Sequence, residues 1–250
     1  MSGIDLLEDA RLLFERAQTH RRHFHDCTGV GDGLLWDIRR TASPDGAVHS
    51  ADLILDRSVL KQAKPIIADI ANNLVHALDH IAAAARRQAN TGKAGRLYFP
   101  FTLDETDFAQ RLAAMTDYIG ADWAALFTAA RTQHQPYLPL LQRLKTISNE
   151  AKHWELRPGM AGANAVQWFA PDHHIVDIPA GHFATEDGFQ FWEGPAPFPN
   201  IGVMIVTAFR IRDDDAVEVD LEPVLETSAT FVAGLIAAAA DHLASLAPPG

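Results

Sequence analysis

Residues 67–84 read IADIANNLVHALDHIAAA, and the fold expected for the chain is built around this segment. Its apolar residues recur at three- and four-residue steps, the spacing that places side chains on one face of a helix. The predicted stripe comprises Ile67, Ile70, Leu74, Leu78, Ile81 and Ala85. Proline is tolerated in the first turn of a helix but not in its interior, so Pro65 predicts a helix that begins near Lys64. Thr91 and Gly92 are expected to end it.

The rest of the chain predicts an α+β protein built around this helix. Further amphipathic helices are expected over residues 4–26, 104–115, 122–132, 136–154 and 224–245. Alternating segments separated by turn residues predict β-hairpins at 34–41 with 47–55, 166–170 with 175–178, 183–185 with 189–192, and 203–212 with 217–221. We expect one compact unit over 1–250, with a helical bundle at 58–157, hairpins at 33–56 and 164–222 that form a mostly antiparallel sheet, and a C-terminal helix at 223–246.

Charge divides the sequence into two parts. The 250 residues include 32 acidic and 21 basic ones, a net charge of −11. Residues 1–157 are neutral, with 19 of each kind, whereas residues 158–250 carry 13 acids against Arg210 and Arg212. A globally acidic chain is a poor generic binder of nucleic acid, but a neutral bundle does not exclude RNA. The acidic last third suits a basic protein partner.

Composition excludes several classes of protein. A hydrophobic share of 48% supplies a sizeable core and excludes disordered and collagen-like chains. Cys27 is the only cysteine, which excludes an intramolecular disulfide and suits a reducing compartment. The N-terminus has acids where a signal peptide has bases, and the longest apolar run, 231–240, is far shorter than the roughly 20 residues of a membrane span. We expect a soluble cytoplasmic protein without a membrane partner.

Two predicted helices carry histidine on the face opposite their apolar stripe. The polar residues are Asp69, Asn73, His76 and His80 in the first, and Thr146, Asn149 and His153 in the second. Such residues are common on solvated helix surfaces, which is the purely structural interpretation. Because imidazole titrates near neutral pH, His80 or His153 could instead act as a general base in a nuclease.

Short motifs link these helices to a known family. They are Ala77-Leu78-Asp79-His80, Phe99-Pro100, Gln135-Pro136-Tyr137 and the Asn149-x-x-Lys152-His153 pattern. Together they resemble an uncharacterised bacterial family whose members carry an ALDH-type helix, an FP connector, a QPY turn and an N-x-x-KH helix. The resemblance covers residues 50–157 and adds only a compatible order of elements after them.

That family is more distantly similar to HEPN-type helical bundles. In those bundles an arginine, separated from a histidine by four to six residues on one helix, helps to form a metal-independent RNase site, often at a dimer cleft. The resemblance implies a HEPN-like core, RNA as a partner, a homodimer, and catalytic candidates His80, His153, Asn149 and Asp79. The position five before His80 is Val75, so the arginine that would stabilise phosphate charge is missing there. We therefore expect a degenerate RNase-type site.

Two alternatives use other properties of the same sequence. His76 and His80 lie four residues apart, the spacing at which two imidazoles on a helix meet one metal ion. A non-catalytic binding or regulatory module would instead use the acidic sheet to recognise a basic partner. The acid-free basic run of Arg86, Arg87, Lys93 and Arg96 provides a positive patch for RNA or for the acidic third of a second copy. No cofactor is expected.

Overall fold

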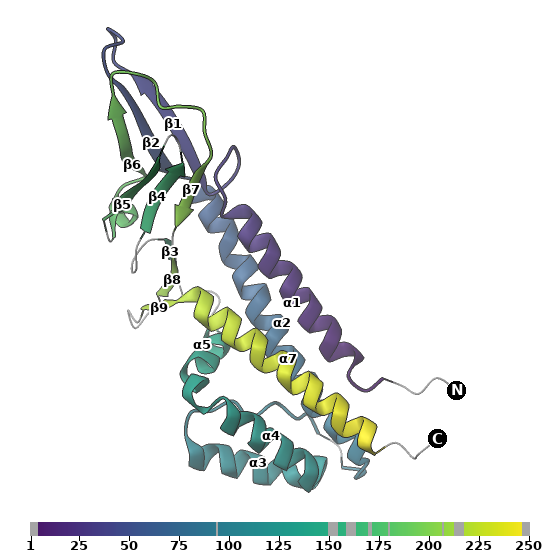
Figure 1. The fold of residues 1–250 in the computed structure, drawn as a ribbon. Helices are drawn as coiled ribbons and strands as arrows, with labels where there is room; N and C mark the ends of the chain where they lie inside the picture. The colour runs from purple at the N-terminus through teal and green to yellow at the C-terminus, as the bar shows by residue number, and fades with distance from the viewer. Residues whose placement is uncertain are drawn as a thin grey trace. The chain divides into compact units, whose positions relative to one another are not determined.

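The computed structural model confirms an α+β fold (Figure 1). It describes residues 5–93, 95–149, 155–158, 164–169, 172–179, 181–206, 208–212 and 218–246. Contacts group the chain into two compact units, a division that the sequence pattern did not predict. The helical unit comprises residues 1–20, 68–151 and 223–250, and the sheet unit comprises residues 21–67 and 152–222. Residues 1–157, which carry no net charge, are therefore divided between the two units.

The helical unit is built on α2 (Arg57–Ala89), whose apolar stripe is buried as predicted. α1 (Glu8–Cys27) and α7 (Leu221–Ser245) add further buried faces, and all three helices contribute residues to both units. α3 (Glu105–Ile119) and α4 (Ala121–Gln133) lie side by side (Figure 1). They are followed by the 3-10 turn η1 (Gln135–Tyr137) and by α5 (Leu138–Asn149).

α2 begins at Arg57, well before the predicted start at Lys64, and contains Pro65 in its interior. The reason is an N-cap: Asp56 Oδ1 accepts hydrogen bonds from the backbone N–H groups of Ser58 and Val59 at 2.7 and 3.3 Å. The cap and the burial of the first turns offset the cost of an interior proline, about 3 kcal/mol. The Ser58 hydroxyl, together with the two N–H groups, also lowers the pKa of Asp56.

The end of the predicted bundle differs from the expectation at residues 155–158. α5 ends at Asn149, and residues 150–154 lie outside the described residues. Glu155–Pro158 forms strand β3 rather than the end of a helix. Leu156 of β3 pairs with Ile211 of β8 (Phe209–Arg212), and both side chains are buried. A partner distant in sequence thus sets this strand, and the local pattern does not reveal it.

The sheet unit holds three antiparallel sheets of three strands each within the described ranges, not the single sheet expected. The strand orders are β1 (Trp36–Ala42), β2 (His49–Leu55), β6 (Gly188–Gly194); β3, β8, β9 (Glu218–Asp220); and β5 (His173–Ile178), β4 (Asn164–Phe169), β7 (Val203–Val206). The hairpins β1–β2, β4–β5 and β8–β9 form as predicted.

The hairpin predicted at 183–185 and 189–192 is wrong. His182–Thr185 forms the short helix α6, and Phe183 packs against Trp36 with ring centroids 4.9 Å apart. β6 pairs with β2 instead. The segment 203–212 also divides, into β7, which pairs with β4, and β8. Packing against distant partners has overridden the local turn signals.

α7 is long and apolar enough to cross a membrane by length and composition, which the length of its apolar run alone does not reveal. Half of its most apolar window is buried. Its core residues include Leu225, Phe231, Val232 and Leu235. This burial is typical of a core helix and is compatible with a soluble protein.

Candidate functional site

Asp79, one of the catalytic candidates, anchors the FP connector. Its Oδ1 accepts a hydrogen bond from the backbone N–H of Phe99 at 2.9 Å. The ring of Phe99 contacts Phe101, Phe127 and Phe231 at centroid distances of 5.4, 5.3 and 5.7 Å. Burial raises the pKa of Asp79, and the hydrogen bond from Phe99 only partly opposes this effect. The ALDH and FP motifs therefore meet in a contact that holds the fold.

His80 joins α2 to α1 within the helical unit. Its Nδ1 lies 3.3 Å from Oδ2 of Asp9, which is an ion-pair distance. The Nδ1 atom is buried, and its contact with Asp9 lacks the geometry of a hydrogen bond. The side chain as a whole is 40% exposed.

The other polar residues of the predicted α2 face divide between core and solvent. Asn73 is only 9% exposed, and its Nδ2 donates to the Asp69 carbonyl at 2.7 Å, whereas His76 is exposed. Asn72 accepts a hydrogen bond from the Ser148 hydroxyl of α5 at 2.7 Å. Part of this side of α2 is therefore a contact between helices rather than a solvated face.

The candidates on the last bundle helix do not extend this cluster. Asn149 is exposed, and His153 lies outside the described residues. In the described part of the chain, no group of three or more His, Cys, Asp or Glu side chains is arranged to hold a metal ion. His76 and His80 thus lack a third ligand there. The contacts of Asp79 and His80 lead to the connector and to α1, and their catalytic role stays a prediction.

Arg131 is a buried residue that the sequence interpretation missed. It is 6% exposed, and its guanidinium donates to the carbonyls of Thr102 and Leu103 at 2.6 and 3.0 Å. Asp79 thus holds the connector at Phe99, and Arg131 holds the segment that follows it at Thr102 and Leu103. The signal was available, because Trp123, Phe127 and Arg131 follow one another at four-residue steps on one face of α4.

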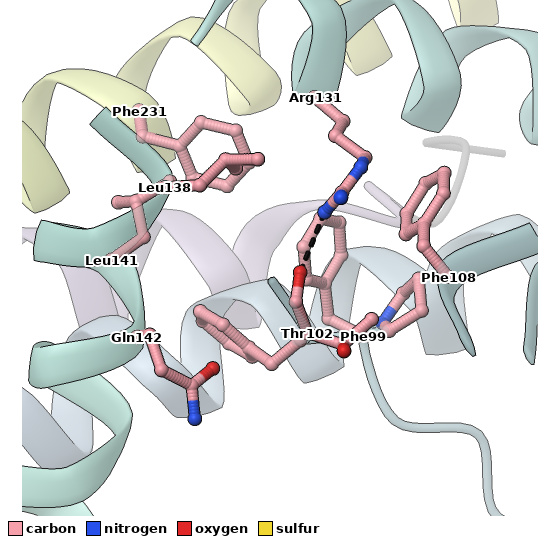
Figure 2. A pocket seen from close by; sticks show the side chains of 10 residues that line it. Phe99, Thr102, Phe108, Arg131, Leu138, Leu141, Gln142 and Phe231 are labelled. Carbon is pink, nitrogen blue, oxygen red and sulfur yellow. Dashed lines mark hydrogen bonds between the residues drawn. The ribbon is translucent and has the colours of Figure 1, made fainter. Parts of the chain in front are cut away.

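Arg131 also borders the cavity drawn in Figure 2. The lining is mostly apolar and comprises Phe99, Pro100, Phe101, Thr102, Phe108, Arg131, Leu138, Leu141, Gln142 and Phe231. The cavity has a volume of about 20 Å³, which holds about one water molecule. It is therefore a packing defect beside the connector rather than a ligand site.

A larger hollow lies at the C-terminal end of α2, within the helical unit. It is open to solvent and has a volume of about 530 Å³. It is lined by Arg86, Arg87, Asn90, Thr91, Gly92, Lys93 and Gly95, three cations and no acid. Asn90 and Gly92 have φ angles of 46° and 71°, so the chain turns through the left-handed region directly after the helix. This turn brings the cations on both sides of it to one concave surface, which we call the basic hollow.

The cations of the basic hollow keep donors for a ligand. Arg87 donates one hydrogen bond to a backbone carbonyl at 2.9 Å, and Arg86 has no ion-pair partner among the described residues. Lys93 Nζ lies 2.8 Å from Asp117 Oδ2, but the two side chains are 46% and 73% exposed, and ion pairs in contact with solvent are weak. The ammonium of Lys93 also lies 5.4 Å from the ring centroid of Tyr118. An aromatic ring therefore stands beside the cations.

No protein-family model, curated protein or solved structure matches the chain. The likeness to the bacterial family and to HEPN-type bundles therefore rests on the motifs alone and stays a prediction. The chemistry of the basic hollow is that of an anion site, because its donors are charged and flexible and no carboxylate lines it.

Proposed function

We propose that this protein is a cytoplasmic bacterial RNA-binding protein whose basic hollow holds the phosphate backbone of a single strand. The observation that carries the proposal is the concave cluster of Arg86, Arg87 and Lys93 beside Tyr118, in which Asp117 is the ion-pair partner of Lys93. Lysine and arginine contacts to phosphate supply most of the affinity of non-specific nucleic-acid binding. Aromatic rings next to such cations stack on the unpaired bases of a single strand.

The proposed activity is binding without cleavage. Asp79 holds the Phe99 N–H, and Val75 stands where a HEPN-type site would have arginine. Neither side chain offers a free cationic or hydrogen-bond-donating group that would stabilise the negative charge on a phosphate as its bond breaks. His80 remains the general base to test, since its side chain is 40% exposed.

The first test measures binding of a fluorescently labelled single-stranded RNA by anisotropy. Removing two cations with Arg86→Ala/Lys93→Ala is expected to weaken binding by about tenfold or more at low salt. The slope of log affinity against log salt should also become shallower, by about 0.7 for each phosphate that the protein no longer neutralises. Double-stranded RNA should bind more weakly than the single strand, because its bases cannot reach Tyr118.

The matched control is Lys61→Ala/Arg111→Ala, which removes the same charge from exposed positions outside the basic hollow. It should retain wild-type affinity within about twofold. Equal losses of affinity in the two double variants would mean that only the total charge of the protein matters, and this would overturn the proposal. Wild-type protein that does not bind the RNA would overturn it as well. The RNA is also run on a gel after incubation. Cleavage that disappears in His80→Ala would overturn the non-catalytic assignment.

A further inference from the structure

One side of the sheet β5-β4-β7 is open to solvent. β4 lies between β5 and β7, and both pairings are antiparallel (Figure 1). Directly opposite residues share a face, so the register places Gln167, Ile175 and Met204 together. We call this side the open face. The register assigns to it Ala165, which is buried, and Gln167, Phe169, His173, Ile175, Asp177, Met204 and Val206.

The open face carries large apolar side chains in water. The exposed fractions are 65% for Phe169, 54% for Ile175, 49% for Met204 and 38% for Val206. The opposite side is packed: Trp168 is 6% exposed and contacts the rings of Phe191 and Phe198 at 5.7 and 5.4 Å. An antiparallel sheet with one solvated side normally has polar residues there. Apolar residues on both sides are typical of strands that are covered on both sides.

The polar groups of the open face partly satisfy one another. His173 Nε2 and Gln167 Oε1 lie 3.3 Å apart, and the His173 ring stacks on Phe169 with centroids 4.3 Å apart. These contacts lower the cost of covering both polar side chains, because each already has a partner. Asp177 is exposed on the same face. None of the described positions of the open face is lysine or arginine.

We propose that the open face docks a basic protein segment whose apolar side chains cover Phe169, Ile175 and Met204. The sheet unit contains 18 acidic and 11 basic residues, a net charge of −7. Lysine or arginine in the partner would pair with Asp177, whereas the same face of a second copy or a phosphate backbone would bring like charge to it. Among the described strands, β5 and β7 are the edges of this sheet, so an extended segment can also add to it by backbone hydrogen bonds.

The test uses two model peptides of equal length, one alternating lysine with valine and one alternating glutamate with valine. Binding is followed by isothermal titration and by backbone amide shifts of the full-length protein. The lysine peptide is expected to bind and to shift amides of β4, β5 and β7. The glutamate peptide should bind at least about tenfold more weakly, because it presents like charge.

Variants locate the binding. Ile175→Thr/Met204→Thr should raise the Kd of the lysine peptide by about tenfold or more, and Asp177→Asn by a smaller factor. Both threonines suit a strand, and the replaced side chains are half exposed, so the fold should be retained. Leu12→Thr/Leu103→Thr is the control, since both leucines are exposed to a similar extent in the helical unit.

Each other outcome contradicts the proposal. Equal binding of both peptides, or equal losses of affinity in the open-face variant and the control, would reduce the effect to general stickiness. Sedimentation velocity of the protein alone gives a second answer: a dimer that Ile175→Thr/Met204→Thr dissociates would make the open face an interface between copies. Displacement of the lysine peptide by single-stranded RNA would assign the face to nucleic acid instead.

Discussion

Replacing Arg131 by alanine is expected to lower the free energy of unfolding by about 2–3 kcal/mol. The substitution leaves the carbonyls of Thr102 and Leu103 without their donor and enlarges the cavity of Figure 2. It also removes a cation that lies 4.5 Å from the ring centroid of Phe108. Urea denaturation followed by circular dichroism measures the change.

Two controls make this result specific. Arg131→Lys keeps the charge but not the planar fork that reaches two carbonyls, so its stability should lie between those of wild type and Arg131→Ala. Arg111→Ala removes an arginine that is exposed and paired with Asp107 one turn away, and it should leave the denaturation midpoint unchanged. A wild-type midpoint for Arg131→Ala would contradict the role of this residue in holding the connector.

Asp79→Ala and Asp79→Asn are expected to have opposite effects. The alanine leaves the Phe99 N–H without an acceptor, so at neutral pH it should be less stable than the asparagine variant by about 1–3 kcal/mol. The asparagine keeps an acceptor oxygen without the cost of burying charge. Because burial raises the pKa of Asp79, Asp79→Asn should be at least as stable as wild type at neutral pH.

The same pair gives a pH dependence with a definite sign. A carboxyl whose pKa is raised in the folded state holds its proton to a higher pH than in the unfolded state. The contribution of Asp79 to stability is therefore greatest below its ordinary pKa of 3.8 and is lost as the pH rises through the raised value. The stability of wild type relative to Asp79→Asn should fall across that window and stay level above it. A rise would mean that the charged form is favoured.

The sequence predicts the helices more accurately than the sheets. The apolar stripe of α2 repeats over many turns, so its burial was predictable. The first residue of the helix was not, because it depends on the N-cap Asp56, which precedes Pro65 in the sequence. β3 and α6 were mispredicted because their conformations depend on Ile211 and Trp36, which are distant in sequence. A short segment contains too little periodicity to outweigh such contacts.

The site residues were predictable only in part. The basic run from Arg86 to Arg96 was visible in the sequence, but its concave form depends on the left-handed turn at Asn90 and Gly92. The structural role of Asp79 was not visible, since its partner is the backbone of Phe99 rather than a side chain. The open face was hidden for a different reason. Its strands have apolar residues at both odd and even positions, which indicates two covered sides.

RNA is expected to bind at the basic hollow of the helical unit. The most direct test is ultraviolet cross-linking of the full-length protein to single-stranded RNA, followed by mass spectrometry of its peptides. The expected adducts lie on peptides that contain residues 86–96 and on the peptide of Tyr118, and they should decrease in Arg86→Ala/Lys93→Ala. Adducts confined to the sheet unit, or unchanged in that variant, would contradict the account.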